Sequence, residues 1–283
     1  MRMPGAKAVL FNAAALLVTV GALAAVVRSL VYSPAMEPCT QRYSNSTAFA
    51  LERGGVVLMA ADLQSGVGGR DAGVIENVTI NRIKNAPSPL VMTVSLAKGA
   101  GSAHGSMAAK GGVSFPWQPR AVQGKTAACL SYQVLLPADF ESGRGGALPG
   151  IQGVDATERS EDGFVARMAW RDGGSGGATN RLTEGGVTRS SVAEREPFAL
   201  PRGRWVKLEQ EVVLNTPKQA DGILRVWVDG KLAIDRAGMD YRAREDITLA
   251  GVAADVFYGT EEGVGSAPKD TKISLTPFEV RWK

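Results

Sequence analysis

Short stretches in which apolar and polar residues alternate recur through most of this chain, and glycine- and proline-containing turns separate them. Alternation with a period of two is typical of half-buried β-strands. The chain has 34 glycines and 14 prolines among its 283 residues, and no amphipathic helix of about 10–15 residues recurs between the stretches. The stretches are residues 73–83, 90–96, 130–136, 163–170, 205–214, 223–228, 252–258 and 273–282. Many strands without intervening helices predict an all-β, antiparallel fold.

The clearest local signal is a β-hairpin. Residues 205–214 and 223–228 are joined by a loop that contains Asn-Thr-Pro and Asp-Gly, and the second stretch ends at Asp229-Gly230. Asp-Gly supplies the positive φ angles that a tight turn requires. An antiparallel chain of this kind folds either as a two-sheet sandwich or as a closed barrel, and the length of the chain favours the sandwich.

The N-terminal region contains an apolar run at residues 8–27 that is long enough to cross a lipid bilayer. Arg2 and Lys7 precede the run, so the positive-inside rule predicts a cytoplasmic N-terminus and a periplasmic or extracellular remainder. A secretory signal usually has a shorter apolar region of about 7–15 residues, which favours an uncleaved signal anchor. The alternative is cleavage near the Ala-Leu-Ala sequence at 22–24 and secretion of the mature chain.

These features divide the chain into three parts. Residues 1–32 are the predicted signal anchor and transmembrane helix, residues 33–53 are a juxtamembrane arm, and residues 54–283 are the globular domain. Hydrophobic residues make up 45% of the chain, which is enough for one sizeable core.

The two cysteines, Cys39 and Cys129, both follow the apolar run. No Cys-X-X-Cys pair or histidine cluster accompanies them, so we expect neither a metal site nor a cofactor. In an exported chain, an even number of cysteines favours one disulfide, which here would join the arm to the domain. Two buried free thiols are the alternative.

The charge balance argues against a nucleic-acid partner. The 32 basic and 28 acidic residues leave a net charge of +4 and are spread along the chain, whereas a nucleic-acid-binding surface needs a concentrated basic patch. A mildly basic groove suits an acidic polymer instead. The sequence leaves the oligomeric state open.

Four segments of the domain carry a more specific pattern. In chain order they are LSYQVLLPADFESGRGGALPGIQG at 130–153, FVARMAW at 164–170, GRWVKLEQEVVLNTPKQADGILRVWVDGKL at 203–232 and DVFYGTEEG at 255–263. In order and spacing they resemble the sequence blocks of the family-14 polysaccharide lyases. The resemblance implies a concanavalin-like β-jelly roll of two antiparallel sheets, with a substrate groove on the concave face. It also implies β-elimination, a carbon–oxygen lyase reaction, in an acidic polysaccharide such as alginate or glucuronan.

The residues that would perform this elimination are mostly replaced. The reaction needs a cation to neutralise the uronate carboxylate, a base to remove the C5 proton and an acid to protonate the leaving oxygen. By the resemblance, these groups come from a lysine in GGKLPG, a serine and an arginine in FSxR, and tyrosines on the following strand. Here Ala147 and Val165 stand at the lysine and serine positions, residues 171–186 contain no tyrosine, and only Arg167 is kept. We therefore predict that elimination is reduced or lost, and whether the chain is an active enzyme stays open.

The candidate site residues combine this resemblance with residue chemistry. The candidate catalytic residues are Arg167, Tyr132 and Tyr258, with Lys207 and His104 as further acid–base candidates. The candidate substrate-binding residues are Arg144, Gln152, Arg167, Gln210 and Arg225. A strand's period of two places Arg167 on the same face as Val165 and Ala169. Each assignment has a structural alternative. Arg167 could form a salt bridge on the sheet, and the other polar residues could lie in a solvated loop or on a solvated face. Trp205 and Trp227 could stack on sugar rings or pack in the core.

Two functions follow from the sequence. One is a lyase-like protein that acts on or binds a uronate-containing exopolysaccharide with its concave sheet. The other is a non-catalytic carbohydrate-binding or structural protein of the cell envelope. Aromatic residues make up only 6% of the chain, which leaves few rings for stacking on sugars. Arginine and lysine side chains can still hold anionic sugars through their charge.

Overall fold

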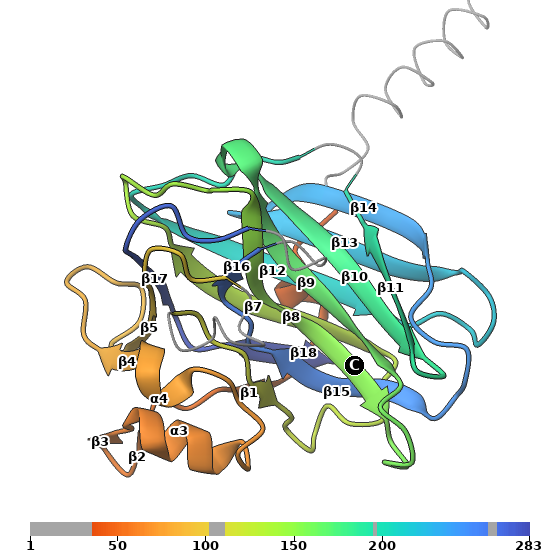
Figure 1. Cartoon of the computed structure of the whole chain (residues 1–283). Coiled ribbons are helices and arrows are strands. Elements are labelled where there is room, and N and C mark those ends of the chain that lie inside the picture. The colour runs from red at the N-terminus through yellow and green to blue at the C-terminus, as the bar shows by residue number, and fades with distance from the viewer. Residues whose placement is uncertain (1–35, 102–110, 195–196, 260–264) are drawn as a thin grey trace, which may run out of the picture. The chain divides into compact units, whose positions relative to one another are not determined.

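The computed structural model of the chain describes residues 36–101, 111–194, 197–259 and 265–283 (Figure 1). The chain divides into two compact units, residues 1–36 and 37–283, and all of the described residues except Met36 belong to the second. None of the helices within these ranges is long and apolar enough to cross a membrane. The predicted signal anchor at residues 1–32 and the candidate His104 lie outside the described residues.

Nine antiparallel strands form the larger sheet. Seven of them run in the order β14-β13-β12-β7-β17-β5-β4, while β18 pairs with β7 and with β1. The strands are β1 (Asn45–Ala48), β4 (Val78–Asn81), β5 (Val91–Leu96), β7 (Ala127–Leu135), β12 (Trp205–Val213), β13 (Gly222–Val228), β14 (Lys231–Met239), β17 (Thr271–Leu275) and β18 (Glu279–Trp282). The predicted hairpin is confirmed, because β12 pairs antiparallel with β13, and Asp229 and Gly230 adopt positive φ at the turn into β14.

Seven antiparallel strands form the second sheet, in the order β11-β10-β9-β8-β15-β6, with β16 also paired to β8. The strands are β6 (Pro116–Trp117), β8 (Gly145–Asp155), β9 (Gly163–Arg171), β10 (Gly176–Glu184), β11 (Val187–Val192), β15 (Ile247–Ala253) and β16 (Phe257–Tyr258). The expectation of an antiparallel, two-sheet, all-β architecture is therefore confirmed.

The remaining elements are short. They are the helices α2 (Cys39–Arg42), α3 (Ala60–Gly66) and α4 (Val74–Asn77), the 3-10 turn η2 (Asp172–Gly174), and a small two-stranded sheet of β2 (Glu52–Arg53) and β3 (Val56–Val57). Figure 1 shows α3, α4, β2 and β3 gathered near β4, so they extend the domain at one end of the larger sheet.

The core lies between the two large sheets. In β9 the even-numbered residues Phe164, Ala166, Met168 and Trp170 are buried and join the same apolar cluster as residues of the nine-stranded sheet. Because successive side chains of a strand point to opposite faces, the odd-numbered residues of β9 point away from this core. This alternation fixes which side chains of β9 can meet a ligand.

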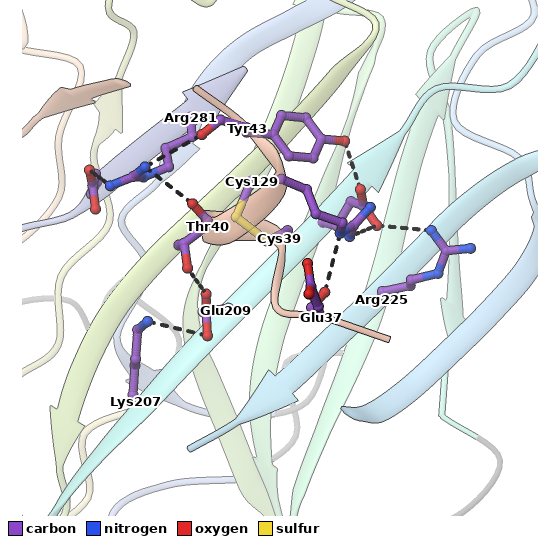
Figure 2. Close-up of a disulfide and its surroundings, with 12 residues drawn as sticks. Glu37, Cys39, Thr40, Tyr43, Cys129, Lys207, Glu209, Arg225 and Arg281 are labelled. Carbon is purple, nitrogen blue, oxygen red and sulfur yellow. Dashed lines mark hydrogen bonds and ion pairs between the residues drawn. A yellow bond between two sulfur atoms is a disulfide. The ribbon is translucent and has the colours of Figure 1, made fainter. Parts of the chain in front are cut away.

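Residues 37–43 lie against the outer side of the nine-stranded sheet (Figure 2). A disulfide joins Cys39 of α2 to Cys129 of β7, with the two Cα atoms 5.7 Å apart. The Tyr43 hydroxyl donates to Oε1 of Glu211 at 2.7 Å, and Nη2 of Arg42 lies 2.8 Å from Oε2 of the same carboxylate. The arm therefore covers carboxylates that would otherwise face solvent on this sheet.

Candidate functional site

The candidate site is the face of the seven-stranded sheet that points away from the core, called the outer face below. The strand registers place its side chains in three rows that cross the strands. The first row is Gly177, Ala169, Ala147 and Phe257, the second is Thr179, Arg167 and Gly150, and the third is Arg181, Val165 and Gln152. Ala147 and Val165 thus stand in the rows on either side of Arg167.

The first row is apolar where the resemblance implies a lysine. Ala147 and Phe257 are each 6% exposed and form a small cluster apart from the main core, with Ala72 packed against it. The Ala147 position is therefore both uncharged and largely covered, so it cannot neutralise a substrate carboxylate.

Arg167, in the second row, already has an acidic partner. Its Nε donates to Oδ2 of Asp255, and the two side chains are only 6% and 2% exposed. The guanidinium carbon lies 5.7 Å from the ring centroid of Phe257. The salt-bridged arginine that the sequence left as an alternative is therefore present, and the ion pair holds the guanidinium in place beside the apolar cluster.

The third row borders a small pocket of about 140 Å³. Val165 lines this pocket between Arg181 and Gln152, and the pocket is also lined by Glu161 and Asp162. The amide of Gln152 donates to the carbonyl oxygen of Val252 at 3.2 Å. Sites that enclose a drug-sized ligand have volumes of about 300–1,000 Å³, so a polymer would lie across this face and would not be enclosed by it.

The two candidate tyrosines are core residues, and their interpretation as catalytic groups at this face is corrected. Tyr132 of β7 is 3% exposed and its hydroxyl donates to the carbonyl oxygen of Pro149 at 3.0 Å. Tyr258 packs with its ring centroid 5.1 Å from that of Trp170, and its hydroxyl donates to the carbonyl oxygen of Glu141. Burial raises the pKa of both phenols above the ordinary value. Neither is placed or poised for proton transfer at Arg167.

Gln210 and Arg225 also lie away from the outer face, which corrects their assignment to a shared groove. The Gln210 side chain lies between the sheets, where it accepts from the Ile151 N–H and donates to the carbonyl oxygen of Ala166, each at 2.9 Å. Arg225 belongs to the nine-stranded sheet and pairs with Glu211 and Asp235, each at 2.9 Å. Gln210 therefore links the two sheets by hydrogen bonds. Arg225 lies on the nine-stranded sheet, away from the outer face.

The other candidates are dispersed. Arg144 is exposed in the turn that enters β8. Lys207 is on the nine-stranded sheet, with its Nζ 3.3 Å from Oε2 of Glu209. Trp227 is fully buried on that sheet, with the Arg42 guanidinium 5.5 Å from its ring centroid. Of the predicted site residues that lie in the described ranges, the structure thus brings together only Arg167 and Gln152 on the outer face.

Three residues of the outer face were not identified from the sequence. Asp255 and Phe257 belong to the DVFYG segment that helped to reveal the family pattern, but their roles depend on the fold. Arg181 lies in a glycine-rich segment, two residues before the threonine that lines the same pocket. Its alternation with Thr179 and Thr183 was a signal that could have placed it on one face of a strand.

A larger cavity of about 400 Å³ lies outside this face, between residues 48–70 and β6. Phe49, Leu63 and Trp117 line it, together with Arg53 and Arg70. None of the predicted site residues lines this cavity, so it is separate from the candidate site.

Comparisons with known proteins agree with this architecture. The family model described as polysaccharide lyase 14 matches residues 84–278. A PL-14 alginate lyase from Aplysia kurodai is similar in structure with a TM-score of 0.65 and 19% identity, over 85% of this chain and 99% of that one. Alginate lyase vAL-1 from Chlorella virus is similar with a TM-score of 0.59 and 19% identity, over 79% and 97% of the two chains. No curated protein gives a significant match. At these identities the structural likenesses show a shared fold.

Proposed function

The chain belongs to the polysaccharide lyase 14 family, and from that premise we propose that its outer face binds an acidic, uronate-containing polysaccharide while its capacity for β-elimination is reduced or lost. The support for an acidic substrate is that two similar solved structures are alginate lyases. The alternative is a non-catalytic structural role in the cell envelope.

One observation carries the reduced activity. Ala147 and Val165 stand on either side of Arg167, in neighbouring rows, and neither side chain can take up or release a proton. A positioned proton donor or acceptor typically contributes about 10²–10⁴-fold to a reaction rate. Loss of both groups would leave the outer face with contacts for a substrate but without the means of moving its C5 proton.

Binding is supported by the charged and polar groups of the second and third rows. Arg181 lines the pocket beside Val165, and Gln152 lines its other side. A guanidinium can pair with a carboxylate through two parallel hydrogen bonds. Such contacts at a surface are screened by salt, so binding to a polyuronate should weaken as ionic strength rises.

The deciding experiment treats the full chain with alginate and glucuronan. The absorbance of unsaturated uronates should stay at the level of a buffer control, while calorimetry should detect salt-sensitive binding. Robust formation of unsaturated uronates would overturn the loss of elimination. Absence of binding to both polymers would favour the structural role.

We also propose that residues 1–32 anchor the chain in a membrane with the globular domain on the periplasmic or extracellular side. The support is the apolar run at residues 8–27 and the basic residues that precede it. The full chain should stay with membranes after a high-salt wash. Recovery of a soluble chain that begins near residue 25 would establish cleavage and secretion instead.

A further inference from the structure

Gly177, in the first row of the outer face, lies beneath a carboxylate of the chain itself. A Cβ atom at this position would lie 2.3 Å from Oε1 of Glu194 and 2.5 Å from Nε of Arg171. These distances are far below a van der Waals contact, so no other residue fits without displacing both groups. Because glycine has no side chain, Gly177 leaves a recess on the sheet, and the Glu194 carboxylate occupies this recess.

Both oxygens of this carboxylate are bound. Nε of Arg171 donates to Oε1 at 2.7 Å, and Nη2 of the same guanidinium donates to the same oxygen. The backbone N–H of Ala178 donates to Oε2 at 2.7 Å. The Glu194 side chain is only 5% exposed, whereas Arg171 is 27% exposed. A guanidinium and a backbone N–H around a recess without a side chain are donors that suit any carboxylate of similar size.

The recess lies among the residues that the proposed function uses. Gly177 is opposite Ala169, which in turn is opposite Ala147, so the recess is two strands from the position where the family pattern has its lysine. The neighbouring row contains Arg167, whose partner Asp255 is also a carboxylate of this chain. Both arginines that β9 presents on the outer face are thus paired with acidic side chains of the same molecule.

We propose that the recess formed by Gly177, Ala178 and Arg171 is a carboxylate-binding site, which Glu194 occupies in the free protein and a uronate carboxylate of the polymer occupies in its place. The identity of this ligand rests on the proposed function, but the recess itself does not. A purely structural role for Glu194 would account for the Ala178 hydrogen bond and for the ion pair with Arg171. It would not account for a site that accepts a free carboxylate, and this difference is measurable.

The first test is chemical rescue by acetate. Glu194→Ala should lower the thermal midpoint, and acetate should restore part of the loss with saturation, because acetate re-supplies both oxygens. The matched control is Glu184→Ala in the β10–β11 hairpin, where Glu184 forms an exposed pair with Arg189 at 3.1 Å and no recess is involved. Acetate should not stabilise that variant beyond wild type. Should Glu194→Ala fail to fold, its soluble yield with and without acetate becomes the readout. Equal responses of the two variants to acetate would overturn the proposal.

The second test measures oligouronate binding. Glu194→Ala should bind about tenfold more tightly than wild type, the size expected for one charge-assisted contact, and Glu184→Ala should bind as wild type does. Adding Arg171→Ala to Glu194→Ala should abolish the gain. Acetate rescue without oligouronate binding by any variant would support the recess and overturn the proposed function. Oligouronate binding without acetate rescue, or without a gain in Glu194→Ala, would overturn the recess as a ligand site.

Discussion

The guanidinium of Arg167 and the carboxylate of Asp255 form an ion pair on the outer face in which both side chains are nearly fully buried. By the sequence resemblance, Arg167 is the one kept member of the family's set of catalytic groups, and Ala147 and Val165 stand in the rows on either side of it. The structure thus keeps this arginine in place through a partner 88 positions away in the chain.

Asp255→Ala should destabilise the protein strongly. Removing one partner of a buried ion pair typically costs about 3–5 kcal/mol, and here the guanidinium would lose the carboxylate that holds it on the outer face. Chemical denaturation followed by circular dichroism measures the change. Asp139→Ala is the control, because Asp139 is 78% exposed and pairs with Lys269 at the surface, where loss of a partner should change little. Similar small effects of both changes would contradict a structural role for the buried pair.

The Cys39–Cys129 disulfide is expected to form in protein recovered from its native compartment, and replacing both cysteines by alanine should lower stability. The two residues are 90 positions apart, and removal of a disulfide that closes a long loop typically costs about 2–4 kcal/mol. Mass spectrometry of non-reduced and reduced protein reports the bond, and denaturation reports the cost. Two free thiols in the native protein would contradict the expectation.

The antiparallel architecture and the β12–β13 hairpin were predictable because their signals are local. Alternation indicates the strands, Asn-Thr-Pro and Asp-Gly indicate the loop between β12 and β13, and Asp229-Gly230 indicates the turn from β13 into β14. By contrast, β8 contains four glycines and a proline among its 11 residues, which resembles a loop until its pairing with β9 and β15 is known. Residues 74–77 were expected to be a strand but form α4. The Asn77 amide donates to the carbonyl oxygen of Gly112 at 2.9 Å, so this turn is held by a contact distant in sequence.

The outer face was only partly predictable for a similar reason. The period of two correctly placed Arg167 with Val165, since residues 163–170 of β9 pair one for one with β10 without a bulge. In β12, however, Glu209, Gln210 and Glu211 are all buried, because the core covers one side and residues 37–43 lie on the other. Because both sides of β12 are buried, polar residues occur on both of its faces. The sequence pattern therefore could not show that Gln210 points into the core and not into a groove. The partner of Arg167 was equally hidden, since no local pattern connects β9 to Asp255.

Acid should destabilise the hairpin that joins β8 and β9 through Asp155. The pKa of Asp155 is lowered from 3.8 to about 2, mainly by the hydrogen bond from the Thr157 side chain. The hydrogen bond from Ser160 and the positive charge of Arg244 lower it further, whereas burial of the carboxylate acts in the opposite direction. A lowered folded-state pKa contributes stability above the unfolded value, and this contribution is lost as the pH falls from about 4 to about 2. Asp155→Asn should therefore flatten the stability profile in that window. A variant whose stability falls as steeply as that of wild type would contradict this assignment.

Arg181 should be the basic residue of the outer face on which polyuronate binding most depends. It lines the pocket beside Val165 and Gln152, whereas Arg167 is already paired with Asp255. Arg181→Ala should weaken binding about tenfold, as expected for loss of a hydrogen-bonded charge contact, and should reduce the dependence of affinity on salt. Titration calorimetry at two salt concentrations measures both effects. Arg204→Ala is the matched control, since Arg204 is 52% exposed and its Nη2 lies 2.8 Å from Oδ2 of Asp229, in the turn between β13 and β14 of the other sheet. If both variants lose affinity equally, the polymer responds to net charge alone and the outer face is not its binding site.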